Sequence, residues 1–430
     1  MSSSLSGVFR SGLIVLAVLA LAPAGAKTIT VCPSCPVRTL KEAFAKATDG
    51  DTVVVDGGHY AEGNLVLDKS IVLEGKNLPV IDGEGKYEIL TVKADGVQIR
   101  GFEFRGSGIN FIKDQAAVKM VDSEHCLIEN NRFIDNFFAI YLEKSRHCMV
   151  RNNRIVSNAE NENYSGNGIH LWNSFDVDIV GNYIAHHRDG IYLEFVRDSR
   201  IVDNVSEDHV RYGLHFMFSE DNLFRGNVFR RSGAGVAVMY SKRTRMEENR
   251  FEYNWGGASY GLLLKDIDDS DIRRNVFFRN TVGIYADGSN RTSVYANDFI
   301  QNGYALRIFA NSMGMIFMYN NFLGNTFDVA TNSTKSYNSY LKNYWDKYEG
   351  YDLDKNGIGD VPYRPVSLFS LLVENYPQAL VLLHSPLVEF MDRAERVFPV
   401  FTPKAIEDDQ PFMFRILWSE WKNLPNDTER

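Results

Sequence analysis

The sequence predicts an all-β fold, a right-handed parallel β-helix, and three observations support it. A motif built on asparagine recurs from Asn131 to Asn320, at intervals of 22, 29, 22, 23, 22, 26, 22 and 23 residues. Each repeat contains short runs with the period of two that is typical of strands, and these runs are too short for helices. No proline occurs between Val80 and Val361, as expected where every backbone N–H serves an inter-strand ladder. Stacked coils with the usual right-handed crossover therefore explain the repeat.

The repeated asparagine is predicted to lie at the corner between two strands of each coil. Asn tolerates left-handed backbone geometry, and its amide can hydrogen-bond to the Asn of the next coil. The corner residues are Asn131, Asn153, Asn182, Asn204, Asn227, Asn249, Asn275, Asn297 and Asn320. The large apolar residue that follows each corner should point inward. We expect one interior column formed by Phe133, Ile155, Ile184, Phe229, Phe251, Phe277 and Phe299.

The N-terminal part of the chain predicts an exported protein. One arginine, Arg10, precedes an apolar run over residues 12–21, and Ala24-Gly25-Ala26 follows it. This pattern predicts a cleaved signal peptide over residues 1–26 and a periplasmic location. The β-helix is expected over residues 27–345. Within it, residues 40–47 have helical spacing and are expected to cap the open edge of the first coil.

Four cysteines remain in the exported chain. Cys32 and Cys35 form a CxxC motif, for which a small structural disulfide is favoured over redox and metal roles. Cys126 and Cys148 are one repeat apart and should face the interior, either as a ladder of thiols or as a disulfide. Both cysteines follow a histidine, so His125 and His147 should also stack one coil apart.

The C-terminal part differs in composition from the repeats. Residues 346–366 form an Asp/Gly-rich loop that resembles most of a calcium-binding loop, although Tyr363 replaces the final glutamate. Its calcium ligands would be Asp352, Asp354, Asn356 and Asp360. The alternative is a polar turn that binds no metal. Residues 367–430 are predicted to be a helical tail, amphipathic over 368–397, that either packs on the β-helix or docks on a membrane partner. Docking is the hypothesis put forward here. Its candidate contact residues are Leu368, Leu372, Leu380, Leu387 and Phe390.

A group of His and Met residues is predicted on one outer face of the β-helix. Because side chains alternate along a strand, inward Ile169 and Leu171 place His170 and its neighbour Trp172 outside. The equivalent outward residues in later coils are Tyr192, Glu194, His215, Met217 and Met239. Thioether and imidazole groups suit Cu(I). We expect His215, Met217 and Met239 to bind Cu(I) in an exposed outward patch, with His170 as a fourth ligand and Trp172, Tyr192 and Glu194 as contact residues. The alternative is a surface used only for protein contact.

Other patterns keep further function classes open. The acidic edge made by Asp176, Asp178 and Asp198 offers the paired carboxylates that a glycosidase needs. His186 and His187 follow a corner and are expected to be either an extra ligand pair or a solvated turn. The formal net charge of −9 provides no electrostatic footprint for nucleic acid.

The chain resembles the NosD family, whose members are periplasmic copper-associated maturation proteins of nitrous oxide reductase. The resemblance rests on the segment TLKEAFAKATDGDTVVVDGGHY, the Asn-x-Phe coils, NYWDKYEGYDLDKNGIGDVPYRP and HSPLVEFMDRAERVFPVFTPKAIEDDQPFM, and spans residues 28–415. It implies a right-handed β-helix that works with the membrane subunit and the ATPase of an ABC transporter. It also implies a copper-donating lipoprotein chaperone and apo nitrous oxide reductase as partners, with the membrane reached through the transporter.

The expected function is therefore copper delivery, or help with assembly of the copper–sulfide centre, rather than catalysis. Two other classes remain: a secreted carbohydrate-active β-helix enzyme, and a scaffold that recruits the reductase without binding metal. Copper titration distinguishes the first class from the last, and a polysaccharide screen tests the enzyme.

Overall fold

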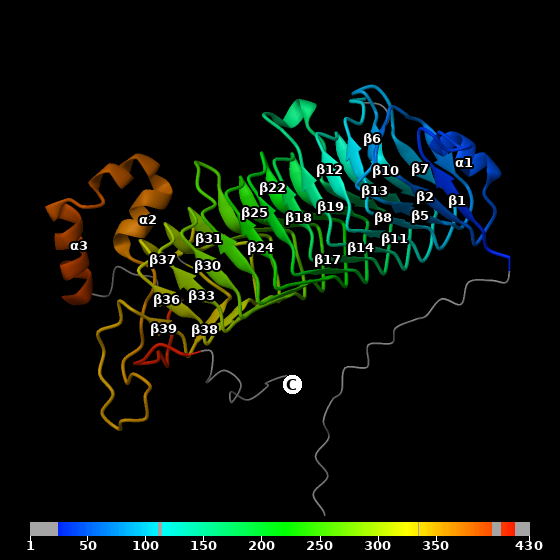
Figure 1. Cartoon of the computed structure of the whole chain (residues 1–430). Helices are drawn as coiled ribbons and strands as arrows, with labels where there is room; N and C mark the ends of the chain where they lie inside the picture. The colour runs from blue at the N-terminus through cyan, green and yellow to red at the C-terminus, as the bar shows by residue number, and fades with distance from the viewer. Residues whose placement is uncertain (1–24, 111–113, 334, 398–405, 418–430) are drawn as a thin grey trace, which may run out of the picture.

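The computed structural model describes residues 25–110, 114–333, 335–397 and 406–417, and it confirms the predicted fold. The chain winds into a right-handed parallel β-helix built from three sheets. Figure 1 shows an elongated stack of coils with α1 at the N-terminal end and α2 and α3 at the other. The predicted signal peptide lies outside the described residues except for Gly25 and Ala26.

We call the three sheets A, B and C in the order in which one coil visits them. Sheet A has 14 parallel strands. They are β1 (Thr28–Val31), β2 (Thr52–Val55), β5 (Val72–Gly75), β8 (Gln98–Arg100), β11 (Leu127–Glu129), β14 (Met149–Arg151), β17 (Asp178–Val180), β20 (Arg200–Val202), β23 (Leu223–Arg225), β26 (Arg245–Glu247), β29 (Asp271–Arg273), β32 (Ser293–Tyr295), β35 (Ile316–Met318) and β38 (Ser339–Leu341).

Sheet B has 13 strands and follows the asparagine corner. They are β3 (His59–Tyr60), β6 (Val80–Asp82), β9 (Glu103–Arg105), β12 (Arg132–Ile134), β15 (Arg154–Val156), β18 (Tyr183–Ala185), β21 (Val205–Glu207), β24 (Val228–Arg230), β27 (Arg250–Glu252), β30 (Val276–Phe278), β33 (Asp298–Ile300), β36 (Asn321–Leu323) and β39 (Tyr344–Trp345).

Sheet C has 12 strands, most of them longer, and carries the predicted His and Met residues. They are β4 (Leu65–Leu67), β7 (Leu90–Val92), β10 (Ala116–Val121), β13 (Phe138–Glu143), β16 (Ile169–Trp172), β19 (Asp189–Glu194), β22 (Tyr212–Met217), β25 (Ala234–Met239), β28 (Tyr260–Lys265), β31 (Val282–Asp287), β34 (Tyr304–Ile308) and β37 (Phe327–Ala330). The insertion before β16 contains the short helix η1 (Glu162–Tyr164).

The predicted asparagine ladder forms the corner between sheets A and B. The backbone N–H and the amide Nδ2 of Asn227 both donate to Oδ1 of Asn249, at 3.0 Å each. The same Nδ2 donates to the carbonyl of Ile201 in the previous coil at 2.8 Å. This pattern satisfies buried polar groups that would otherwise be expensive to bury. The structure adds Asn343 as the last asparagine of the ladder.

The predicted interior column is also present. Phe133, Ile155, Ile184, Phe229, Phe251, Phe277 and Phe299 are all fully buried. Register pairing connects them coil by coil and extends the column to Phe322 and Trp345. Ser206 interrupts the column between Ile184 and Phe229. Each large apolar side chain buried in this way contributes about 1.5–3 kcal/mol relative to an exposed one.

The helix α1 (Leu40–Lys46) closes the N-terminal end, as predicted. Thr39 caps it, because its side-chain oxygen accepts a hydrogen bond from the backbone N–H of Glu42 at 3.1 Å. Leu40, Ala43 and Phe44 are buried against the first coils. The helix therefore covers apolar residues that an open first coil would expose.

The C-terminal tail contributes both helices and a return segment. The helices are α2 (Leu368–Asn375), the 3-10 helix η2 (Pro377–Leu382) and α3 (Pro386–Val397). An ion pair of 2.8 Å joins Arg307 in sheet C to Glu374 in α2. Residues 406–417 then lie along the last coils, where Ile416 exchanges two backbone hydrogen bonds with the Asn321 side chain.

Asp408, in this return segment, ends the asparagine ladder. The fully buried carboxylate accepts hydrogen bonds from the backbone and Nδ2 of Asn343 at 2.9 and 3.0 Å, and from Nε1 of Trp345 at 3.0 Å. It also accepts from the backbone N–H of Lys342 at 3.0 Å. In the preceding coils, the acceptor is Oδ1 of the asparagine in the next coil. In the last coil, the carboxylate of Asp408 in the tail replaces it.

Candidate functional site

The strand register of sheet C places the predicted residues in two adjacent outward columns. The first column contains Tyr141, His170, Tyr192, His215 and Ala237 on successive strands. The second column contains Glu143, Trp172, Glu194, Met217 and Met239. Met217 and Met239 are direct register partners, and His215 lies two residues before Met217 in β22.

The expectation that these histidines lie in an exposed patch is wrong. His170 is 7% exposed and His215 is 4% exposed, although both point out of the sheet. Neighbouring rings cover them. His170 lies between Tyr141 and Tyr192, with ring centroids 4.5 and 4.8 Å away, and Tyr192 stacks on His215 at 4.7 Å. Side-chain alternation gives the direction of a residue and does not reveal what packs over it.

A buried carboxylate lies beside His215. Asp189 is fully buried and accepts two hydrogen bonds from Arg211, at 2.9 and 2.5 Å. Nδ1 of His215 is 3.6 Å from Oδ2 of Asp189. Burial opposes ionisation of Asp189, but the nearby His215 ring and the hydrogen bonds from Arg211 more than offset it and lower the pKa of Asp189 below the usual range.

His170 has a different partner. Its Nδ1 is 3.3 Å from the amide Nδ2 of Asn167, whose Oδ1 accepts a hydrogen bond from Arg188 at 3.1 Å. Burial, followed by the nearby charge of Arg188, lowers the pKa of His170 to about 3. Nε2 of His170 and both ring nitrogens of His215 are buried without a hydrogen-bond partner, so the contact of His215 Nδ1 with Asp189 is electrostatic.

An exposed aromatic ladder, which sequence reasoning missed, adjoins the two methionines. Phe195, Phe218 and Tyr240 directly follow Glu194, Met217 and Met239, and they are 48%, 44% and 41% exposed. Their φ angles are +55°, +50° and +51°, a region that bulky residues rarely adopt. The signal in the sequence was an aromatic residue at a corner position where other coils have Asn173, Asp266 or Gly288.

The rings of this ladder stack on one another. Centroids are 5.3 Å apart for Phe195 and Phe218 and 5.1 Å apart for Phe218 and Tyr240, with interplanar angles of 11° and 14°. Because the faces cover each other, the ladder presents mainly ring edges to the outside. Such a surface suits apolar protein side chains better than a sugar ring, which would stack on an aromatic face.

The tail residues predicted for partner contact divide into two groups. Leu372 packs against the cluster formed by Phe327, Phe369 and Val373, so it helps to hold α2 on the β-helix. Leu368 is likewise half-buried, in the first turn of α2. The exposed members are Leu380, Leu387 and Phe390.

The Asp/Gly-rich loop is held together by its own carboxylates. Asp352 accepts backbone hydrogen bonds from Asn356 and Gly357 at 3.1 and 2.8 Å, and Asp360 accepts one from Leu353 at 2.7 Å. Asp354 accepts from the side chain of Asn356 at 2.8 Å. Across the described residues, no group of three or more His, Cys, Asp or Glu side chains is arranged to hold a metal ion. Calcium at this loop therefore stays a prediction.

The cysteines have different states. Cys32 and Cys35 form the expected disulfide. Cys126 and Cys148 are free and buried, and the backbone N–H of Cys126 lies 3.4 Å from Sγ of Cys148. They thus form the interior ladder of thiols that was one of the two alternatives.

Two of the remaining histidines belong to a second corner. His187 and His209 are buried in the ladder between sheets B and C, where the backbone N–H of His187 donates to Nδ1 of His209 at 3.2 Å. Later coils place asparagines at this corner: Asn254, Asn280, Asn302 and Asn325. Burial lowers the pKa of His187 to about 3 and that of His209 to about 4. His187 is therefore neither a solvated turn residue nor part of the His/Met columns.

The acidic edge considered for glycosidase chemistry is largely paired. Both carboxylate oxygens of Asp178 accept hydrogen bonds from Arg200, at 2.7 and 2.6 Å. Asp176 lies 2.6 Å from Nδ1 of His147, which stacks on His125 with ring centroids 5.1 Å apart. These pairs occupy carboxylate oxygens that acid–base catalysis would use.

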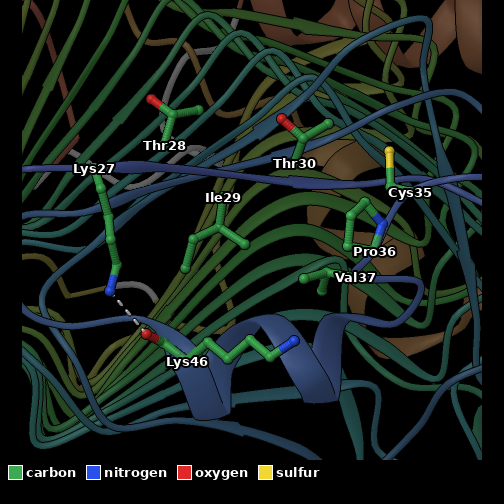
Figure 2. Close-up of a pocket in the computed structure, with 8 residues that line it drawn as sticks. All are labelled: Lys27, Thr28, Ile29, Thr30, Cys35, Pro36, Val37 and Lys46. Atoms are coloured by element: carbon green, nitrogen blue, oxygen red, sulfur yellow. Dashed lines mark hydrogen bonds between the residues drawn. The ribbon is translucent and has the colours of Figure 1, made fainter.

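A cavity of about 540 Å³ lies at the N-terminal end, far along the chain from these columns. Its lining residues are Lys27, Thr28, Ile29, Thr30, Cys35, Pro36, Val37 and Lys46. Figure 2 shows Ile29 and Val37 on the side of α1, whereas Thr28 and Thr30 lie on the other side of β1. The lining contains no His or Met, so this cavity does not belong to the predicted copper site.

Comparison with known protein families shows to which family the chain belongs. The model of the family described as periplasmic copper-binding protein (NosD) matches residues 45–165 and 158–350. The chain belongs to the NosD family. A similar protein of Pseudomonas aeruginosa, named probable ABC transporter binding protein NosD, is 29% identical over 462 residues, which cover 95% of this chain and 96% of that protein. A Stutzerimonas stutzeri protein of the same name is 37% identical over 71 residues, or 16% of each chain.

Solved structures of other families share only the fold with this NosD-family chain. The catalytic domain of a GH87 α-1,3-glucanase in complex with tetrasaccharides has a TM-score of 0.60 at 12% identity, covering 75% of this chain and 70% of that one. PfbA, a surface adhesin of Streptococcus pneumoniae, has a TM-score of 0.52 at 13% identity, covering 68% and 87%. Within the part of the chain that the structure describes, no helix is both long and apolar enough to cross a membrane.

Proposed function

We propose that this NosD-family chain is a periplasmic accessory protein that binds Cu(I) and passes it on during maturation of nitrous oxide reductase. The observation that carries the proposal is the register of sheet C, which places His215, Met217 and Met239 together on one face. Soft thioether donors and a neutral imidazole suit Cu(I). The family description as periplasmic copper-binding protein supports the same metal and compartment.

The exit route for copper would be the exposed side of the methionines. Met217 and Met239 are half-buried, whereas both imidazoles are covered. A partner would therefore meet the thioethers first, beside the aromatic ladder. We expect a copper-donating lipoprotein chaperone and apo nitrous oxide reductase to use this face in turn.

The helical tail supplies a separate contact. Leu380, Leu387 and Phe390 are exposed at the C-terminal end, on elements that α2 anchors to the β-helix. Apolar side chains gathered outside a folded core are typical of an interaction site. We propose that they dock on the membrane subunit of an ABC transporter and thereby bring the chain, with the transporter's ATPase, to the membrane. The names of the two relatives support this partner.

Anaerobic Cu(I) titration of the purified protein against a competing chelator tests the metal proposal. The variant M217L/M239L keeps volume and apolarity nearly constant, and we expect its Cu(I) affinity to fall by about 100-fold, or about 2.7 kcal/mol. The matched control M149L/M313L changes two methionines outside the columns and should bind as the wild type does. Equal affinity of M217L/M239L and wild type would refute this site. A wild-type protein without Cu(I) affinity would favour the metal-free scaffold.

A further inference from the structure

We propose that Asp189 and Asn167 hold the two buried imidazoles of sheet C in opposite tautomers, so that only His215 offers a lone pair at Nε2 to the metal. Asp189 is then a positioning residue of the copper site, and His170 is excluded from the ligand set. The identity of the metal rests on the function proposed above. The tautomers themselves exist without metal, so they can be tested independently.

The surroundings of Asp189 determine the tautomer of His215. The Asp189 carboxylate is ionised and bound to the guanidinium of Arg211 through both oxygens. An ionised carboxylate can only accept hydrogen bonds. Nδ1 of His215 lies 3.6 Å from Oδ2 of Asp189. At this position the negative charge favours a protonated Nδ1 over an Nδ1 that presents its lone pair. In the neutral ring the lone pair is then on Nε2.

The surroundings of Asn167 determine the opposite tautomer of His170. A guanidinium only donates, so the hydrogen bond from Arg188 fixes the amide of Asn167 with Oδ1 toward Arg188. The amide nitrogen therefore faces His170 and donates to Nδ1 at 3.3 Å. Since Nδ1 accepts, the proton of this neutral ring is on Nε2.

The two Nε2 atoms are alike in burial but differ in their proton. Both are buried without a hydrogen-bond partner, but a metal binds the one with a lone pair. A carboxylate that holds Nδ1–H while Nε2 binds metal is a recurring support for histidine ligands. Space also favours His215, because its register partner on β25 is the small Ala237.

Nitrogen NMR of metal-free protein labelled at histidine tests the tautomers directly. We expect the His215 signals to show protonated Nδ1 and the His170 signals to show protonated Nε2, with H215Q and H170Q used for assignment. Either ring in the other tautomer would overturn the inference. If the tautomers are as expected but Cu(I) shifts neither ring, the copper proposal fails while the tautomer assignment stands.

The variant N167D provides a reciprocal test that leaves Asp189 untouched. The new carboxylate can still accept a hydrogen bond from Arg188. Its other oxygen faces Nδ1 of His170 and can only accept, where the amide nitrogen donated. We expect the His170 tautomer to reverse, so that Nε2 gains a lone pair, while the signals of His215 stay unchanged. An unchanged His170 tautomer in N167D would contradict the role of Asn167.

The variant D189N tests the positioning role. An amide beside His215 no longer selects one tautomer, so we expect mixed His215 signals and a fall in Cu(I) affinity of about 10- to 100-fold. The control D176N alters a similar carboxylate–imidazole pair, with His147, outside the site, and should leave Cu(I) affinity unchanged. If folded D189N keeps one His215 tautomer and wild-type affinity, Asp189 has no positioning role. If D189N does not fold, because Arg211 loses its partner, the NMR of wild type and N167D still decides the assignment.

Discussion

The corner between sheets A and B and the outer face of sheet C are both columns of equivalent residues, but they follow different rules. At the corner, nine consecutive coils repeat asparagine, and each amide completes the same hydrogen bonds. On sheet C, the first outward column changes from Tyr141 through His170, Tyr192 and His215 to Ala237. The repeat records a structural requirement that every coil shares. We propose that functional residues lie where the outward columns vary, at histidine, methionine and exposed aromatic residues.

The largest effect is expected from breaking the corner. N227A removes the acceptor of Asn204 and the donor to the carbonyl of Ile201, and both groups are buried. We expect the free energy of unfolding to fall by about 2–6 kcal/mol, at about 1–3 kcal/mol for each buried group left without a partner. Urea unfolding measures the change. N311A removes an exposed asparagine and should alter stability little; equal losses in the two variants would contradict the ladder's role.

The corner between sheets B and C contains two buried histidines, so its contribution to stability should depend on pH, unlike that of the asparagine corner. The lowered pKa values of His187 and His209 mean that the unfolded chain takes up protons first as the pH falls below about 6.5. Stability is therefore fully present above that pH and decreases as the pH falls toward 4. Between pH 7 and 5 we expect a loss of about 2 kcal/mol for each imidazole.

The double variant H187N/H209N restores the asparagines that later coils use at this corner. Asparagine does not titrate, so urea unfolding at pH 7 and 5 should show about 4 kcal/mol less acid destabilisation than in wild type. H186N changes the exposed neighbour and serves as the control. An acid destabilisation as large as that of wild type would mean that these two rings titrate normally in the folded chain.

The smallest effect on stability is expected at the aromatic ladder. F195N/F218N/Y240N replaces bulky residues at positive φ with one that tolerates this geometry. The gain offsets the lost stacking, so the free energy of unfolding should change by only about 1 kcal/mol. Cu(I) transfer to apo nitrous oxide reductase should nevertheless slow. Y337N, which removes an exposed tyrosine elsewhere, is the control, and transfer at the wild-type rate by the triple variant would show that the ladder contacts no partner.

The sequence alone determined the β-helix, its interior column, its asparagine corner and the helix at its N-terminal end. These features follow from local periodicity, because each coil repeats the same contacts with its neighbours. The pairing of Met217 with Met239 followed from the same periodicity, since strand alternation and coil length set the register. The sequence also determined the family resemblance, through segments outside the repeat.

Only the tertiary structure decided what covers each outward residue. Rings from neighbouring coils bury His170 and His215. Asp189 and Asn167 contact these two histidines, and the repeat did not predict either contact. Asp408 shows the same limit, because it ends the ladder from 65 residues beyond Asn343. The rings and Asp189 belong to regular strands, whereas Asn167 follows an insertion and Asp408 lies in the tail. The period of the sequence sets the spacing of the coils, but it does not determine which side chains close over one another or where an insertion or the tail makes contact. The fold of this protein is thus largely local in origin, whereas the environment of its candidate copper ligands is not.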